Sequence, residues 1–324
     1  MCIDPIVLFF LCGIFIKLIF PSLKMPRLVY DSVSVFLLIS IGLKGGLELC
    51  TWASLSLLVQ VLGILLLSIG ICFLAYFLLD HFGSYNKADC VVIAAHYGSV
   101  SVGTFAVAIA MLEHLGIDYE SFMPLFVALM EFPAIIIASL MLKNIYHGNQ
   151  SFMRSFFNAL SCKSVYVLLL SIAFGYVFGP YGIDVIEPLF FNPFKWILAV
   201  FLVEMGILVG DQFSLIKKHY KEIVLHSIGL SLIGASLGLL FGLIFQLSLG
   251  GVILLMVLAA SASYIAVPAS LRQSYPQANV PLALSHSLGV TFPFNVFFGI
   301  YMYIAAASWI FNYFGLDKSV YFCS

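Results

Sequence analysis

The sequence predicts an all-α integral membrane protein with ten transmembrane helices, arranged as a 5+5 inverted repeat. Three observations support this: the composition, the number of apolar runs, and a similarity between the two halves of the chain. Of the 324 residues, 63% are hydrophobic and only 9% are charged, and the mean hydropathy is +1.12. Soluble proteins carry about 25% charged residues, so most of the outer surface must face lipid.

The apolar runs divide the chain into ten segments of membrane-spanning length. A helix needs roughly 17–25 apolar residues to cross the hydrocarbon core, and charged residues, prolines and glycines separate the runs. We therefore expect a first repeat over 1–145, a cytoplasmic linker over 146–163 and a second repeat over 164–324. The expected helices cover about 5–21, 28–46, 52–80, 86–113, 120–145, 164–180, 193–212, 220–246, 250–273 and 280–314.

The distribution of basic residues predicts the orientation. Lysine and arginine in short loops mark the cytoplasmic side. With the linker in the cytoplasm, only Lys44, Lys195 and Lys318 fall outside. The cytoplasmic set is then Lys17, Lys24, Arg27, Lys87, Lys143, Arg154, Lys163, Lys217, Lys218, Lys221 and Arg272. This bias places both termini outside, which in a bacterial cell means the outer side of the cytoplasmic membrane.

The two halves of the chain resemble each other in three places, in the same order and at a nearly constant spacing. An odd number of helices per repeat forces the second copy to insert upside down, which is the inverted-repeat architecture of secondary transporters. The matched pairs are IGLKGGLEL (41–49) with MGILVGDQF (205–213), IAAHYGSVSVGTFA (93–106) with LAASASYIAVPASL (258–271), and EFPA (131–134) with TFPF (291–294).

The fourth and ninth segments are interrupted by polar and small residues. Residues 95–104 and 260–268 are rich in serine, glycine and alanine, and the second stretch contains Pro268, which lacks a backbone N–H. These features predict broken helices that cross near the membrane midplane, because freed backbone groups need partners away from lipid. The alternative is that the small residues only allow helices to pack closely.

Two broken helices would form a site for a small anion. The N-termini of half-helices present free N–H groups and positive dipole ends. Hydroxyls can come from Ser99, Ser101, Ser261 and Ser263, and unwound carbonyls can hold Na⁺. No Asp, Glu, Lys or Arg lies within 94–112 or 258–271. Such a neutral site suits an anion coupled to Na⁺ better than one coupled to protons, which require a titratable carrier.

A few other polar residues lie inside predicted helices. Glu131 must face a polar interior, where it either coordinates a cation or steadies the broken helix by a hydrogen bond. Asn295 is its pseudo-symmetric counterpart. Lys44 and Glu48, one turn apart, are expected to neutralise each other. His96 is expected to be a hydrogen-bonding strut beside the site.

At these residues the chain resembles a known family, the sodium-dependent bicarbonate transporters of the cyanobacterial SbtA type. The resemblance is strongest in HYGSVS and IGLKGG and covers nearly the whole chain. It also includes DPIVLFF (4–10), LLISIGLKGGLEL (37–49), AAHYGSVSVGTFAVA (94–108), ALMEFPAI (128–135) and SYIAVPASLR (263–272).

The resemblance implies a gate domain from helices 1, 2, 6 and 7 and a core domain from helices 3–5 and 8–10. It also implies a homotrimer embedded in membrane lipids, with Na⁺ beside bicarbonate. The Na⁺ would lie near Ser101, Ser261 and Glu131. Bicarbonate would lie against Gly98, Ser99, Val100, Ser101, Ser263, Tyr264 and Ile265. Cyanobacterial members have a longer linker and a PII-like cytoplasmic regulator, SbtB, and the short linker here argues against that regulator.

The function expected from these observations is Na⁺-coupled uptake of bicarbonate by alternating access. Two alternatives stay open: a transporter of another small anion, such as a monocarboxylate or sulfate, or a passive anion channel or anion sensor with a transporter fold. An enzyme is not expected, because no nucleophile–base pair, phosphate loop or metal-ligand cluster is found, and no organic cofactor is implied. The near-zero net charge of −1 argues against nucleic acid as a partner.

Overall fold

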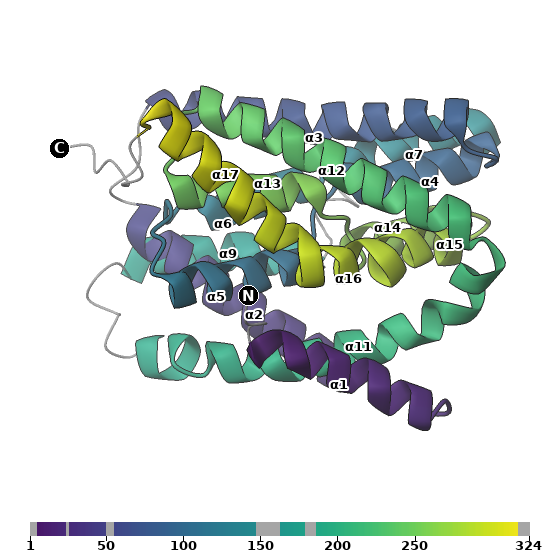
Figure 1. The fold of residues 1–324 in the computed structure, drawn as a ribbon, viewed down its shortest axis with the longest axis horizontal. Coiled ribbons are helices and arrows are strands. Elements are labelled where there is room, and N and C mark those ends of the chain that lie inside the picture. The colour runs from purple at the N-terminus through teal and green to yellow at the C-terminus, as the bar shows by residue number, and fades with distance from the viewer. Residues whose placement is uncertain (1–4, 24–25, 50–54, 147–162, 179–185, 317–324) are drawn as a thin grey trace.

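The computed structural model describes residues 5–23, 26–49, 55–146, 163–178 and 186–316, and every regular element within these ranges is helical (Figure 1). The predicted linker at 146–163 lies almost entirely outside them. Seven helical segments are long and apolar enough to cross a membrane: Leu28–Leu47, Ser56–Phe82, Lys87–Leu115, Met123–Tyr146, Glu187–Phe213, Tyr220–Ile244 and Val280–Phe314. Three shorter apolar helices cover Val7–Ile19, Val165–Phe178 and Leu249–Ala260. The prediction of an all-α membrane protein is confirmed.

The helices of the first half fall where the apolar runs predict them. Two of the predicted segments are each divided into two helices. The elements are α1 (Pro5–Ile19), α2 (Arg27–Leu49), α3 (Leu55–Phe82), α4 (Lys87–Gly98), α5 (Val102–Leu115), α6 (Met123–Glu131) and α7 (Pro133–Tyr146).

The second half begins with α9 (Lys163–Phe178) and continues through α11 (Phe194–Lys218), α12 (Tyr220–Ile244), α13 (Leu249–Ala260) and α14 (Ala266–Ser274). A short π-helical turn, Glu187–Phe191, precedes α11. The last predicted segment is one uninterrupted helix with two further π-helical turns, Ser287–Thr291 and Asn295–Gly299. Its α-helical parts are α15 (Val280–His286), α16 (Phe292–Phe294) and α17 (Ile300–Phe314).

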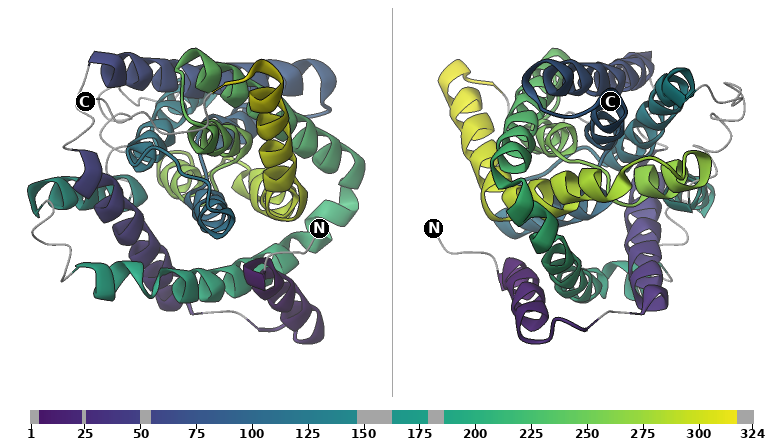
Figure 2. Two further views of the ribbon diagram at one scale, coloured as in Figure 1. Left: turned by 60° about the vertical axis from the view of Figure 1, so that its left-hand side comes forward. Right: turned by 90° about the vertical axis from the view of Figure 1, so that its right-hand side faces the viewer.

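Four helices form two closely packed pairs on one side of the bundle. Helix α1 packs along α11, and α2 packs along α9 (Figures 1 and 2). Glycines let the backbones approach: a Cβ on Gly13 would meet the backbone of Val203, and a Cβ on Gly46 would meet that of Ile172. In lipid, where apolar side chains gain little by leaving the bilayer, such small-residue contacts drive helix association.

The segment Lys87–Leu115, made of α4 and α5, is enclosed by the rest of the protein over residues 90–112, which include the interruption. All of the window that qualifies it as a membrane span is buried. Helices α3, α7, α13 and α15 pack around it. An irregular backbone is tolerated at membrane depth only where protein shields it from lipid, so this enclosure is what permits the interruption between α4 and α5.

Lys44 forms an ion pair between helices, whereas its expected pairing with Glu48 stays a prediction. The Lys44 Nζ lies 2.7 Å from Glu113 Oε1 on α5 and donates to the Tyr119 hydroxyl at 3.1 Å. The side chain of Glu48 lies outside the described residues. A partner one turn away is the obvious one from sequence, but the packing of α2 against α5 supplies an acid from another helix.

Candidate functional site

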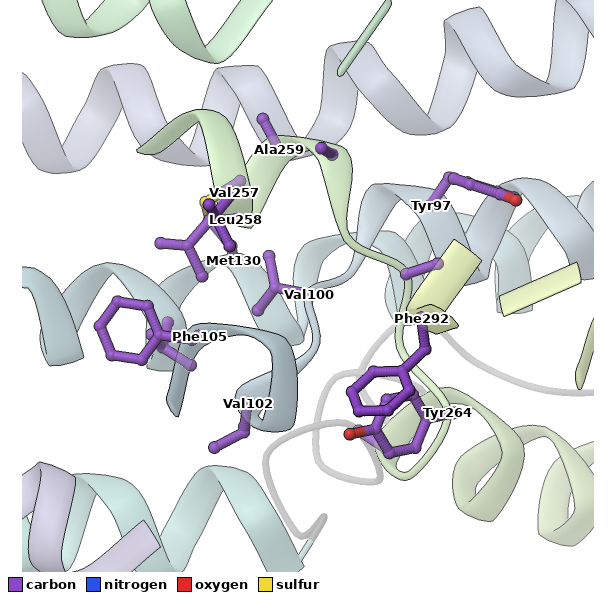
Figure 3. Close-up of a cluster of buried hydrophobic side chains, with 14 of the residues drawn as sticks. Tyr97, Val100, Val102, Phe105, Met130, Val257, Leu258, Ala259, Tyr264 and Phe292 are labelled. Carbon is purple, nitrogen blue, oxygen red and sulfur yellow. The ribbon is translucent and has the colours of Figure 1, made fainter. Parts of the chain in front are cut away.

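Two interrupted helices cross inside the bundle. Helix α4 ends at Gly98 and α5 begins at Val102, whereas α13 ends at Ala260 and α14 begins at Ala266. Figure 3 shows Val100 and Val102 on one interruption and Tyr264 on the other. Both predicted breaks are therefore present, and close packing alone does not account for the serines there.

Two hydrogen bonds join the interruptions. The backbone N–H of Ser101 donates to Ser261 Oγ at 2.9 Å, and the backbone N–H of Ser263 donates to the carbonyl of His96 at 2.8 Å. Each break thus satisfies a backbone group of the other. Because buried N–H groups need partners, these bonds fix the two breaks against each other.

Ser101 also starts α5. Its hydroxyl accepts from the Thr104 N–H at 3.1 Å and from the Thr104 hydroxyl at 2.9 Å, which is an ordinary N-cap. On the other helix, the Ser263 hydroxyl accepts from the Val267 N–H at 3.4 Å. Pro268 lies in the first turn of α14, where a missing N–H costs nothing. The polar residues and the proline therefore start the second half-helices.

The two breaks differ in length, which corrects the register of the sequence match. That match pairs Gly98 with Ser263, but in the structure Gly98 and Ala260 are the residues that end α4 and α13. The ends of the first half-helices, Gly98 and Ala260, are 162 residues apart, and the starts of the second, Val102 and Ala266, are 164 residues apart, because the second interruption, 261–265, is two residues longer than the first, 99–101. Small residues in both stretches hide this shift from a sequence comparison.

The positive end of α5 is covered by two aromatic side chains. A Cβ added to Gly103 would meet the Tyr264 hydroxyl and the ring of Phe201, which belongs to α11. The Tyr264 ring packs edge-on against Phe292, with ring centroids 5.4 Å apart (Figure 3). The Tyr264 hydroxyl therefore lies at a helix terminus that favours negative charge.

The remaining predicted anion-site residues surround the crossing in different ways. Ser99 is fully buried and donates to the backbone carbonyl of Glu131 at 3.0 Å. Gly98 faces away from the other break, since a Cβ there would lie 2.5 Å from Cys72 Cβ and 2.8 Å from Ala134 Cβ. Val100 is buried and Ile265 is partly exposed. The geometry gives Gly98 a packing role.

For the predicted sodium ligands, the structure brings Ser101 and Ser261 into direct contact. Glu131 ends α6 and is 1% exposed, and its backbone carbonyl accepts from the Ser99 hydroxyl in the break. No group of three or more His, Cys, Asp or Glu among the described residues could hold a metal ion. The Ser101 and Ser261 hydroxyls are oxygen groups of the kind that Na⁺ accepts.

Sequence reasoning missed two serines that hold the ends of α4 and α13, whereas Asn295, which acts beside one of them, is singled out from the sequence as the counterpart of Glu131. The Ser68 hydroxyl, on α3, donates to the carbonyl of Gly98 at 2.7 Å. The Ser231 hydroxyl, on α12, donates to the carbonyl of Ala260 at 2.9 Å, and Asn295 Nδ2 donates to the same carbonyl at 3.1 Å. Each serine is a lone hydroxyl within an apolar span, a signal too common in membrane helices to single out beforehand.

Comparison with known proteins identifies the family of the chain. No curated protein matches the sequence. Residues 5–308, however, match the sequence profile of the Na⁺-dependent bicarbonate transporter superfamily. The matched region contains both interruptions and all residues predicted to surround them. The chain thus belongs to the Na⁺-dependent bicarbonate transporter superfamily.

Proposed function

We propose that the protein takes up bicarbonate together with Na⁺ across the bacterial cytoplasmic membrane. The observation that carries this proposal is the crossing, where Ser101 N–H bonds Ser261 Oγ and Ser263 N–H bonds the His96 carbonyl. Two helix N-termini and several hydroxyls meet there without an acidic or basic residue in either interrupted stretch. A small anion is stabilised at such a place by N–H groups and helix dipoles.

The bicarbonate site in this proposal consists of Gly98, Ser99, Val100, Ser101, Ser263, Tyr264 and Ile265. Na⁺ lies beside it, at Ser101, Ser261 and Glu131. Coupling follows because Na⁺ offsets the charge of the anion, so that each ligand raises the affinity for the other by the same factor.

We further propose that the ten helical segments form two inverted repeats of five, with a gate domain and a core domain. The pairing of α1 with α11 and of α2 with α9 supports this, because these are the first two helices of one repeat packed against those of the other. The interrupted helices belong to the core, which moves against the gate. The family resemblance favours a homotrimer, the distribution of basic residues favours both termini outside, and the short linker disfavours a PII-like regulator.

The test is uptake of labelled bicarbonate by purified protein in liposomes, with and without an inward Na⁺ gradient. We expect saturable accumulation that requires Na⁺, and empty liposomes are the control. Accumulation at the same rate without Na⁺ would contradict the coupling. Inhibition by sulfate or a monocarboxylate, stronger than by unlabelled bicarbonate, would favour another anion. Flux that neither saturates nor follows Na⁺ would indicate a channel, and binding without flux would indicate a sensor.

A further inference from the structure

Three histidines and a tyrosine form a second polar cluster beside the crossing, to which His96 also belongs through its backbone carbonyl. We call it the histidine cluster: His96 on α4, His226 on α12, His286 on α15, and Tyr85 in the turn before α4. The Tyr85 ring packs against two of the histidine rings, with centroid distances of 5.6 Å to His226 and 5.5 Å to His286. The three imidazoles are electrostatic neighbours.

This cluster contains buried polar atoms that no described group satisfies. The atoms are His96 Nε2, His286 Nε2, His226 Nδ1 and the Tyr85 hydroxyl. His96 and His286 are both 0% exposed. Native proteins rarely leave buried polar groups without a partner, since each costs roughly 1–3 kcal/mol. Four in one place indicate a position that receives a polar ligand.

The hydrogen bonds already present define what His96 offers. Its Nδ1 lies 2.7 Å from the Val92 carbonyl, which can only accept, so Nδ1 carries the hydrogen. In the neutral ring, Nε2 is then a bare acceptor. His286 differs, because its Nδ1 lies 3.0 Å from the Ser227 hydroxyl. That hydroxyl has a second possible acceptor, the His286 carbonyl at 3.5 Å, but the shorter distance favours donation to Nδ1, so that the His286 Nε2 carries hydrogen and is a donor. The cluster thus offers both an acceptor and a donor.

The charged groups around the cluster favour an anion on the side of His96. Arg272, in the last turn of α14, is exposed and interacts electrostatically with His96. The acidic neighbours act on the other members of the cluster: Glu222 acts on His226 and Tyr85, and Asp89 acts on Tyr85. An anion between His96, His286 and Arg272 meets a positive charge and a donor.

Bicarbonate matches this combination better than other small anions. It carries one O–H that can donate to His96 Nε2 and oxygens that can accept from His286 and Arg272. Nitrate has a similar planar shape but no hydrogen, so it would leave the His96 acceptor unsatisfied. A site built to pair with a hydroxyl discriminates strongly against an analogue that lacks it.

We propose that the histidine cluster is a second bicarbonate position, between the crossing and the end of the bundle that carries Lys87 and Arg272. This inference rests on the proposed function. Charge distribution predicts that end to be cytoplasmic, so the second position lies on the path by which the anion leaves the crossing. Two positions in series, each binding the anion less tightly than a single strong site would, allow the anion both to enter and to be released.

The test is equilibrium binding of radiolabelled bicarbonate to the purified full-length protein at saturating Na⁺. We expect two anions bound per chain, of which nitrate displaces at most one. His96→Asn keeps a donor for the Val92 carbonyl but has no atom at the place of Nε2, so this variant should bind one bicarbonate per chain. His96→Gln restores an acceptor near that place and should bind two, the second weakened by roughly three- to tenfold.

The controls separate this inference from folding and from the proposed function. His81→Asn changes an exposed histidine on α3 that stacks on Phe77 and should leave two sites. Ser101→Ala should weaken the crossing site and leave the cluster site. Two sites in folded His96→Asn protein, or one site in the wild type, would overturn the second position while leaving the transporter proposal intact. No binding by the wild type would overturn both.

Discussion

At the scale of single residues, Ser101 combines two roles that are usually separate. Its hydroxyl caps α5 by accepting from Thr104, and its backbone N–H donates to Ser261 on the other interrupted helix. The hydroxyl therefore sets the direction of the α5 terminus, while the backbone fixes the distance between the breaks. A substitution at this residue separates the two contributions, because it removes only the hydroxyl.

Ser101→Ala should reduce bicarbonate uptake more than it reduces folding. Removing an N-cap costs about 1 kcal/mol, and the crossing bond through the backbone remains. The same substitution takes away a hydroxyl that would bond the anion, which should lower uptake by roughly a further tenfold. The matched control is Ser236→Ala, which removes an exposed hydroxyl bonded to the Leu232 carbonyl on α12. Equal uptake by the two variants at equal protein levels would remove Ser101 from the site.

Gly98→Ala should destabilise the protein, because the new Cβ would lie 2.5 Å from Cys72 Cβ and 2.8 Å from Ala134 Cβ. Overpacking of this kind costs about 1–3 kcal/mol. Gly70→Ala is the control, since nothing lies within 4 Å of a Cβ there on α3, and it should be neutral or stabilise by up to about 1 kcal/mol. Thermal unfolding in detergent measures both. A stable Gly98→Ala protein would show that α4 can shift away from α3 and α7.

Glu120 ties the turn before α6 to the start of α13. Its carboxylate accepts from the Ser248 N–H at 2.6 Å and from the Ser248 hydroxyl at 3.1 Å. Burial raises the pKa of Glu120 above the usual range of a glutamate, although these two bonds act in the opposite direction. The folded protein therefore binds this proton more tightly than the unfolded chain does.

Glu120→Gln should change how stability depends on pH. A carboxyl whose pKa is higher in the folded protein than in the unfolded chain stabilises the fold fully at pH values below its pKa in the unfolded chain. This stabilisation is lost as the pH rises through the pKa of the carboxyl in the folded protein. The wild type should therefore lose stability relative to Glu120→Gln as pH rises above about 4.3, the ordinary pKa of a glutamate. Glu120→Ala, which removes both acceptors, should be less stable than either at every pH. Parallel unfolding curves for wild type and Glu120→Gln would refute the assignment.

At the scale of elements, each first half-helix of the crossing ends on a serine from a neighbouring helix. Ser68 on α3 donates to the Gly98 carbonyl and Ser231 on α12 donates to the Ala260 carbonyl. The four last carbonyls of any helix lack partners within the helix, and in an enclosed bundle only side chains can serve them. The two serines therefore hold the ends of α4 and α13 in place.

Ser231→Ala should be milder than the double change Ser231→Ala with Asn295→Ala. The Ala260 carbonyl keeps the Asn295 bond in the single variant and has neither bond in the double one. Because residues that share a partner are not additive, the double change should destabilise by about 1 kcal/mol more than the sum of the single changes. Unfolding of the four proteins of this cycle gives the coupling. If the double change destabilises the protein by no more than the sum of the two single changes, water replaces the missing donors.

The sequence predicts elements better than it predicts contacts. Apolar runs place nearly all helices correctly, because the bilayer thickness sets their length. The interruptions at 99–101 and 261–265 are also foreseeable, because serine, glycine and Pro268 cost too much in a lipid-facing helix. The register between the breaks, the serines at the helix ends and the partner of Lys44 depend on which helices become neighbours. A single sequence carries no such information about Ser68 or Glu113.

At the scale of the whole molecule, one ion pair connects the two proposed domains. Lys44 on α2 lies in the proposed gate, and Glu113 on α5 lies in the proposed core, with Nζ and Oε1 2.7 Å apart. The two side chains are 41% and 32% exposed, so the pair contributes less than about 1 kcal/mol. Any movement of the core along the gate separates them, which makes the pair a small bias toward the conformation seen here.

Charge reversal at this pair should shift the balance between conformations. Lys44→Glu or Glu113→Lys places like charges together and should change the uptake rate by roughly two- to fivefold. The double reversal should restore a rate close to that of the wild type. Uptake by all four proteins in liposomes at low ionic strength measures this. If the double variant is no faster than the single ones, the pair does not report on movement between the domains.

The enclosure of residues 90–112 also limits how the chain can be assembled. This segment is made early, but α13 and α15, which cover it, and Ser261, which pairs with it, come from the second half. Until those helices have entered the bilayer, the interrupted backbone of the fourth segment either faces lipid or stays at the bilayer surface. Neither half is therefore a folding unit by itself. A chain that ends after the first half would be degraded by membrane proteases, so the two halves of the chain must fold together.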